Sequence, residues 1–133
     1  MKVLFVCSGN AHRSPLAEAL LKKLRPDLEV DSAGTHVAIP ISEEAKEYLI
    51  KHDAGQYLKR VPESLHNKQL NQYDLIVAME QRHRDHVLSR CPNCKDKLAV
   101  WNIKDPYFMS SEDAQKIYEQ IRQKVAKLAA RAL

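Results

Sequence analysis

The chain has 133 residues, of which 29% are charged and 44% hydrophobic, and it carries a formal net charge of +4. These proportions predict one globular domain over residues 1–133 with a core of its own. The sequence excludes a membrane-spanning protein, because no apolar run approaches the length of a membrane span. It also excludes a nucleic-acid binder, because Lys and Arg form no dense run with interleaved aromatic residues.

A strand, a helix and a second strand are predicted at the start of the chain. The apolar run over residues 2–7 does not alternate, which indicates a strand buried on both faces. Residues 15–25 place four leucines on one stripe and predict a helix. A short strand follows over residues 29–32, and residues 33–34 are expected to turn the chain. The three elements together predict a right-handed parallel unit.

The middle of the chain has weaker patterns. A loop over residues 35–41 leads to a second helix, for which Ser42 is a favourable N-cap and which runs to about His52. Residues 56–72 are polar and predict a loop with a short helix. Residues 73–79 are nearly all apolar and predict a third buried strand.

The last third of the chain contains the strongest periodicity. A charged helix is expected over residues 80–90, a turn over 91–94, a fourth strand over 98–101 and a loop over 102–109. A final helix follows, and its tail, residues 129–133, is expected to fray. Its apolar positions repeat at steps of three and four: Ala114, Ile117, Tyr118, Ile121, Val125 and Leu128.

The alternation of strands and helices predicts an α/β fold, doubly wound and flavodoxin-like, with a four-stranded parallel sheet flanked by helices. In such sheets ligands bind at the carboxyl ends of the strands, beside the point where the strand order reverses. The loop after the first strand is expected to lie at that edge.

That loop carries the chemistry of the chain. Residues 7–15 read Cys-Ser-Gly-Asn-Ala-His-Arg-Ser-Pro, and Gly9 and Asn10 are residue types that tolerate positive φ. A loop of this kind turns its N–H groups inward at a helix N-terminus and binds an anion, while Arg13 adds a planar fork that fits a tetrahedral oxyanion. A Cys7 thiolate in that positive field is a nucleophile for phosphoryl transfer; the alternative is an inert buried thiol.

The spacing Cys7-x5-Arg13-Ser14 before a proline resembles the phosphate-binding loop of the low-molecular-weight protein tyrosine phosphatases. Asp105-Pro106-Tyr107 resembles the general-acid loop of the same family. The resemblance implies that Cys7 forms a cysteinyl-phosphate, that Arg13 binds the phosphoryl group and that Asp105 protonates the leaving oxygen. For Asp105 the alternative is an ordinary Asx-Pro turn.

The resemblance also implies supporting roles. Ser32 would lie under the loop and hold its Asn, or it is a plain serine at the end of a strand. Tyr107, and more weakly Phe108, would line the substrate entrance, or they are ordinary surface aromatics. The other residues of the phosphate-binding loop would surround the phosphoryl group: Ser8, Gly9, Asn10, Ala11, His12 and Ser14.

Some positions depart from the family pattern. His12 stands where the family commonly has a second Cys, and it would either stabilise the Cys7 thiolate or point outward. Ala11 matches neither the bulky residue of the tyrosine-specific members nor the Thr of the phosphoarginine branch. Cys91 and Cys94 form a C-x-x-C pair, which is half a zinc site, a redox dithiol or a turn with two ordinary thiols.

The sequence therefore predicts a phosphomonoester hydrolase, a protein tyrosine phosphatase of the low-molecular-weight type. A protein-arginine phosphatase is the alternative, followed by an arsenate reductase and a phosphoryl carrier. We expect no metal and no cofactor, and a phosphorylated protein or small phosphoester as partner. Three cysteines, one of them catalytic, favour a reducing, cytoplasmic location. The sequence leaves the oligomeric state open, with a monomer as the default.

Overall fold

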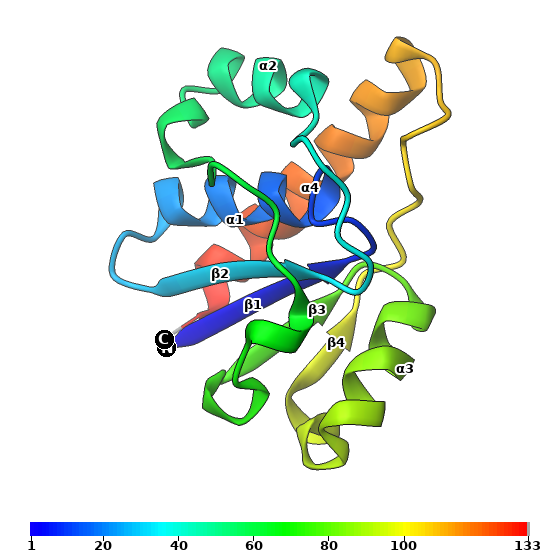
Figure 1. The fold of residues 1–133 in the computed structure, drawn as a ribbon. Coiled ribbons are helices and arrows are strands. Elements are labelled where there is room, and N and C mark those ends of the chain that lie inside the picture. Colours follow the sequence, from blue (N-terminus) through cyan, green and yellow to red (C-terminus); the bar gives the residue numbers. More distant parts are fainter. Residues whose placement is uncertain (133) are drawn as a thin grey trace.

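A four-stranded parallel sheet forms the centre of the computed structural model, which describes residues 1–132. The strand order is β2–β1–β3–β4, so the predicted doubly wound sheet is confirmed (Figure 1). The strands are β1 (Lys2–Cys7), β2 (Glu29–Gly34), β3 (Leu75–Ala78) and β4 (Leu98–Val100).

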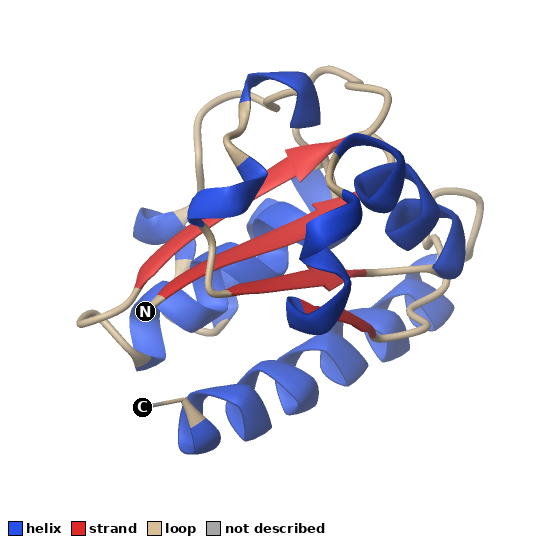
Figure 2. Cartoon of the chain, turned by 90° about the horizontal axis from the view of Figure 1, so that it is seen from below, coloured by secondary structure: helices blue, strands red, loops and turns tan. Residues whose placement is uncertain are grey.

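Helices cover both faces of this sheet (Figures 1 and 2). Helices α1 (Arg13–Leu24) and α4 (Ser111–Arg131) pack on one face, and α3 (Gln81–Arg90) packs on the other. Helix α2 (Glu43–Lys51) lies against α1 and α4. Among residues 1–132, no helix is both long and apolar enough to cross a bilayer.

Strand β1 is buried on both faces, as its unbroken apolar run predicts. Val3 and Phe5 belong to the core under α1 and α4, whereas Leu4 and Val6 belong to the core under α3. A strand in this position has no polar face, which explains why its residues do not alternate.

Two boundaries differ from prediction, the first because of contacts distant in sequence. Strand β2 does not turn at Ala33 but continues to Gly34, which pairs with Cys7 and donates its N–H to the carbonyl of Glu63 at 2.9 Å. Helix α1 starts at Arg13, two residues before the expected start. Residues 55–72 contain three short 3-10 helices: Gly55–Tyr57, Leu65–Asn67 and Leu70–Gln72.

The end of α4 was also predicted wrongly. Residues 129–131 are helical rather than frayed, because Arg25 Nη1 donates to the carbonyls of Ala129 and Ala132 at 2.7 and 2.6 Å. A cation that binds the last carbonyls of a helix satisfies acceptors that have no partner inside it. Leu133, the last residue of the predicted tail, lies outside the described residues.

Cys91 and Cys94 form a disulfide, so the interpretation of this pair as two ordinary thiols was wrong. Cys91 follows the last turn of α3, and the N–H of Cys94 donates to the Cys91 carbonyl at 3.0 Å. This tight turn brings the two Cα atoms to 5.4 Å, within the range that a disulfide bridges.

The sheet order fixes where a ligand can bind. Strand β1 lies between β2 and β3, so successive connections leave it on opposite sides. The reversal opens a crevice at the carboxyl ends of β1 and β3, where Cys7 ends its strand.

Candidate active site

Residues 8–14, which we call the anion loop, cross the carboxyl end of β1 and lead into α1. The carbonyls of Cys7, Ser8, Gly9 and Ala11 accept hydrogen bonds, at 2.8–3.1 Å, from backbone N–H groups of residues 35–42. In a trans peptide the C=O and the following N–H point in opposite directions. The N–H groups of the next residues therefore point toward the inside of the loop, where they can bind an anion.

Gly34 makes this loop shape possible from below. A Cβ at Gly34 would lie 2.6 Å from the Ser8 carbonyl oxygen and 2.8 Å from the Asn10 nitrogen. Asn10 adopts φ 53°, as its residue type allows, whereas Gly9 does not have a positive φ. The loop thus rests directly on the backbone of β2.

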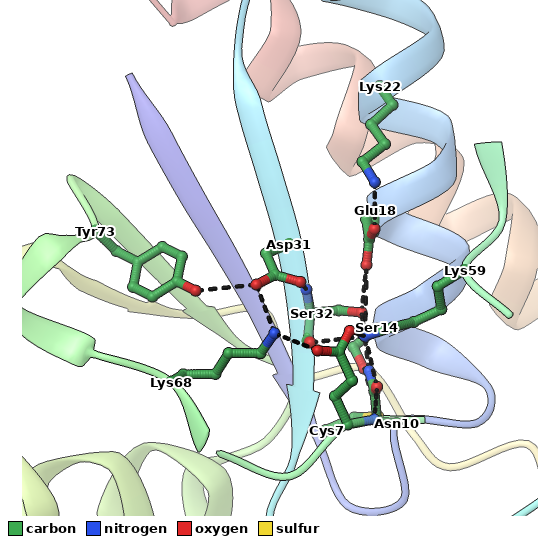
Figure 3. A network of polar contacts seen from close by, with 11 residues as sticks. Cys7, Asn10, Ser14, Glu18, Lys22, Asp31, Ser32, Lys59, Lys68 and Tyr73 are labelled. Carbon is green, nitrogen blue, oxygen red and sulfur yellow. Dashed lines mark hydrogen bonds and ion pairs between the residues drawn. The ribbon is translucent and has the colours of Figure 1, made fainter. Parts of the chain in front are cut away.

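The Asn10 side chain is fully buried and holds the loop through both ends of its amide (Figure 3). Its Nδ2 donates to Ser14 Oγ at 2.9 Å and to Ser32 Oγ at 2.8 Å. Its Oδ1 accepts from Lys59 Nζ at 2.8 Å and from the Glu63 N–H at 2.7 Å. Four hydrogen bonds leave the amide no freedom to flip.

Ser14 connects this amide to the sulfur. Ser14 Oγ lies 2.9 Å from Cys7 Sγ and accepts from Asn10 Nδ2. A thiolate can only accept a hydrogen bond, so with ionised Cys7 the single Ser14 hydroxyl proton must point at sulfur. The arrangement stabilises a buried negative sulfur.

Arg13 is 2% exposed, and its guanidinium is held from outside the loop. Nη1 donates to the Ile103 carbonyl at 2.7 Å and also to Glu80 Oε2. Burial raises the pKa of Glu80, but hydrogen bonds from Arg13 and Arg82 lower it by a larger amount, so the pKa of Glu80 is below its ordinary value. An ionised Glu80 keeps the planar fork aimed at the loop.

Asp105 lies at the mouth of the site, in the loop between β4 and α4. Its Oδ2 is 3.7 Å from Arg13 Nη2, and its side chain is 44% exposed. Its Oδ1 accepts from the Tyr107 N–H at 3.0 Å. Tyr107 and Phe108 are exposed and stack edge to face with centroids 4.7 Å apart. Asp105 can reach a ligand in the loop, and the aromatic pair stands outside it.

His12 does not add a positive charge to the site. Its Nε2 contacts the Tyr118 hydroxyl and lies 3.3 Å from Ser42 Oγ. Burial, with a smaller effect from Arg13, lowers the pKa of His12 to about 4 despite the opposing charge of Asp105. The ring is therefore neutral near pH 7 and packs between α2 and α4, so neither sequence-based interpretation of His12 holds.

A second histidine, His83, supports the loop and was not predicted. Its Nδ1 accepts from the Glu80 N–H at 3.0 Å, which places the ring proton on Nε2. Nε2 therefore donates to Ser8 Oγ at 2.8 Å. Burial and the charges of Arg13 and Arg82 lower the pKa of His83 to about 4.

The structure brings most of the predicted site residues together. Cys7, Arg13 and Asp105 converge on the anion loop, and Ser32 lies beneath it as expected. Tyr107 and Phe108 follow Asp105 but project into solvent. The supporting residues that sequence reasoning missed are Glu18, Lys59, Glu80 and His83.

Glu80 and His83 had a signal in the sequence, because they have the three-residue spacing of a helix capping box, and they form one at the start of α3. Glu18 had no such signal, although it lies one turn after Ser14 on the buried side of α1. Lys59 lies in an unpatterned segment and had no signal.

Taken together, the site holds a sulfur nucleophile under a ring of N–H donors, a buried guanidinium at the side and a carboxyl group at the entrance. Such an arrangement can bind a tetrahedral oxyanion, attack its central atom and transfer a proton to a leaving group. No buried side-chain nitrogen or oxygen in residues 1–132 lacks a hydrogen-bond partner, so the site is held by the protein itself.

The sequence has relatives among known proteins. Residues 2–133 match the family model described as low molecular weight phosphotyrosine protein phosphatase. The chain is also 33% identical, over 132 residues, to the low molecular weight protein-tyrosine-phosphatase Wzb of Escherichia coli strain K12. That alignment covers 87% of this chain and 84% of Wzb.

Two solved structures show the same fold. Vibrio vulnificus Wzb in complex with benzylphosphonate superposes with a TM-score of 0.88 at 28% identity, covering 98% of this chain and 97% of that one. The YwlE arginine phosphatase from Geobacillus stearothermophilus also gives a TM-score of 0.88, at 29% identity, covering 98% of this chain and 91% of that one.

Proposed function

We propose that this protein hydrolyses phosphotyrosine in proteins through a cysteinyl-phosphate. The chain belongs to the low molecular weight phosphotyrosine protein phosphatase family, and that membership is the basis for the proposal. The single observation that carries the proposal is the convergence of Cys7, Arg13 and Asp105 on one anion loop. These are the nucleophile, the anion binder and the proton donor that the resemblance implied.

In the first step the Cys7 sulfur attacks phosphorus in line with the leaving oxygen. The S–P bond forms as the P–O bond breaks, and Asp105 gives its proton to the departing phenolate oxygen. The charge on the three equatorial oxygens is stabilised by the loop N–H groups and by Arg13.

In the second step a water molecule attacks phosphorus, and the S–P bond breaks. The Asp105 carboxylate takes the proton from the water, which restores the acid for the next turnover. The sulfur leaves as a thiolate, and the Ser14 hydroxyl, 2.9 Å away, donates to it. Phosphate is then released.

The test is turnover of phosphotyrosine and p-nitrophenyl phosphate in EDTA by the wild type, Cys7→Ser and Asp105→Asn. Cys7→Ser is expected to lose turnover of both. Asp105→Asn is expected to lose roughly 10²-fold on phosphotyrosine and less on p-nitrophenyl phosphate, whose leaving group needs less protonation. Asp27→Asn, which changes an exposed carboxylate in the α1–β2 loop, is the control. Equal losses on both substrates would contradict the role of Asp105.

A protein-arginine phosphatase is the second candidate. The similarity to the Geobacillus stearothermophilus arginine phosphatase supports it, and the small Ala11 in the anion loop leaves room for either substrate. The ratio of kcat/KM for a phosphoarginine peptide to that for the matching phosphotyrosine peptide decides between them. A ratio well above one would replace phosphotyrosine as the substrate while leaving the mechanism intact.

We also propose that the protein acts in the cytoplasm as a monomer. Cys7 must stay a free thiol to react, which a reducing compartment favours. Thiol-trapping of the protein from intact cells measures the redox state of its cysteines, and light scattering after gel filtration measures its mass. An oxidised Cys7 in cells, or a dimer mass, would contradict these two statements.

A further inference from the structure

Lys59 is a buried cation that lies beneath the anion loop without lining it (Figure 3). It belongs to the segment between the 3-10 helices Gly55–Tyr57 and Leu65–Asn67, and its side chain is only 8% exposed. We propose that Lys59 is a positioning residue that acts on Cys7 through Asn10. The inference rests on the proposed function for its effect on turnover.

The ammonium group reaches three acceptors below the loop. Lys59 Nζ donates to Asn10 Oδ1 at 2.8 Å, to the Ser32 carbonyl at 2.9 Å and to Ser32 Oγ at 3.2 Å. A lysine ammonium has donors and no acceptor. Whatever atom of Asn10 faces Lys59 must therefore be its oxygen.

The orientation of the Asn10 amide determines the direction of the hydrogen bonds that follow it toward Cys7. With its oxygen held by Lys59, Asn10 presents its NH₂ to Ser14 and Ser32. Ser14 then accepts from Asn10 and turns its hydroxyl proton toward the Cys7 sulfur. Together with the Glu63 N–H, which donates to the same oxygen at 2.7 Å, Lys59 fixes the sense of every hydrogen bond from Asn10 to the nucleophile. Its charge also strengthens the first bond of the series, which the neutral N–H does not.

Lys59 also has a structural role, which must be separated from this one. Its Nζ lies 2.8 Å from Glu63 Oε1 and 3.9 Å from Oε1 of the buried Glu18. Glu18 has a second cationic neighbour, since Lys22 Nζ lies 2.6 Å from its other oxygen. Removing Lys59 leaves Glu18 with one cation instead of two, which costs stability whatever happens to catalysis.

Lys68 provides a matched control for that cost. It lies in the same part of the chain, is 10% exposed, and its Nζ bridges Asp31 at 2.7 Å and Glu63 at 2.8 Å. Its partners are these carboxylates rather than any group of the anion loop (Figure 3). Lys68→Met therefore removes a buried, doubly paired ammonium that shares the Glu63 carboxylate with Lys59 but does not itself contact Asn10.

The experiment compares Lys59→Met with Lys68→Met by three measurements. These are the melting temperature, the rate of iodoacetamide alkylation of Cys7, and kcat and KM for p-nitrophenyl phosphate. Cys91 and Cys94 are disulfide-bonded, so without reductant Cys7 is the thiol that alkylates. Both variants are expected to have a lower melting temperature than the wild type. Only Lys59→Met is expected to slow alkylation and lower kcat, each by about tenfold or more.

A double-mutant cycle then tests the path through Asn10. Asn10→Gly keeps the positive φ while removing the amide. In the Asn10→Gly background, adding Lys59→Met is expected to change the alkylation rate by less than twofold. A tenfold effect that persists without the amide would overturn the proposal, as would equal effects of Lys59→Met and Lys68→Met on alkylation.

Two provisions keep the test decisive. Should Lys59→Met not fold, Lys59→Met/Glu18→Gln removes the ammonium and its buried counter-ion together, and the same tenfold loss is expected relative to Glu18→Gln. Alkylation needs no turnover, so a wild type that hydrolyses no ester would refute the proposed function while Lys59 remains testable. An active wild type with unaffected Lys59→Met would refute this inference alone.

Discussion

Gly34 shows how strongly one missing side chain can shape a catalytic loop. It is the last residue of β2 and pairs with Cys7 across the sheet. The backbone of the anion loop lies so close that a Cβ would collide with backbone atoms, which cannot move aside as the tip of a side chain can. The loop therefore depends on a glycine that belongs to the neighbouring strand.

Gly34→Ala is expected to lower kcat/KM by about tenfold or more and the free energy of unfolding by about 1–3 kcal/mol, because the loop must lift off the sheet. Steady-state kinetics and urea unfolding measure the two effects. Gly55→Ala is the control, since the one close contact of its Cβ would be a side-chain atom, Cγ1 of the exposed Ile50 at 2.8 Å, and backbone atoms lie at 3.5 Å or more. Comparable effects of the two substitutions would show that the close approach is unimportant.

At this scale the sequence predicts the residues in and beside the anion loop better than the distant residues that support them. Cys7, Arg13 and Ser14 have a fixed spacing within one loop, so a local pattern was sufficient to find them. Lys59 reaches Asn10 from 49 positions away, and no local pattern encodes such a contact. The hydrogen bond from His83 to Ser8, over 75 positions, was hidden for the same reason.

Among the elements, α4 is the one whose prediction from periodicity was most secure. Its buried side chains, among them Ile117, Ile121 and Val125, face the sheet at four-residue steps. Ser110 caps its first turn by accepting the Asp113 N–H at 3.2 Å. Periodicity found this helix, but its last turn is stabilised by Arg25, which lies far away in sequence.

Ile121→Ala is expected to lower the free energy of unfolding by about 2–5 kcal/mol, since Ile121 is fully buried and the cavity cannot collapse completely. Urea denaturation measures the change. Gln123→Ala, an exposed position of the same helix, should stay within about 0.5 kcal/mol of the wild type. A small loss at Ile121 would mean that α4 packs loosely on the sheet.

The Cys91–Cys94 disulfide lies at the opposite end of β4 from the anion loop, between α3 and the start of that strand. Reduction is expected to lower the free energy of unfolding by about 2 kcal/mol, the loop-closure effect of so short a ring, with turnover unchanged. Cys91→Ala/Cys94→Ala separates this effect from that of reductant on Cys7. A loss of activity in the double variant would reveal coupling between the two ends of the sheet.

Two buried histidines make the stability of the whole molecule depend on pH in one direction. The pKa of His83 is about 4 in the folded chain, below its ordinary value, so the unfolded chain binds a proton first as the pH falls. The stability from a neutral His83 is complete above its ordinary pKa and decreases as the pH approaches 4, by up to about 3 kcal/mol. His12 acts in the same direction.

Unfolding free energies measured between pH 7 and pH 4 check this prediction. His83→Gln, which does not titrate, is expected to flatten the slope between about pH 6.5 and pH 4 relative to the wild type. Burial raises the pKa of Glu63, but hydrogen bonds from Lys59 and Lys68 lower it by more, so its contribution to stability is lost only as the pH falls below the ordinary pKa of a glutamate. Parallel curves for the two proteins would contradict a buried, neutral His83.

The anion loop is held open by hydrogen bonds to residues 35–42 and by contact with β2, not by its ligand. Inorganic phosphate presents the same tetrahedral oxyanion as the phosphorylated substrate, so we expect the product to compete with the substrate for the loop. Phosphate in the cell would then act as feedback. Dephosphorylation would slow when phosphate is abundant and would speed up again when phosphate is scarce.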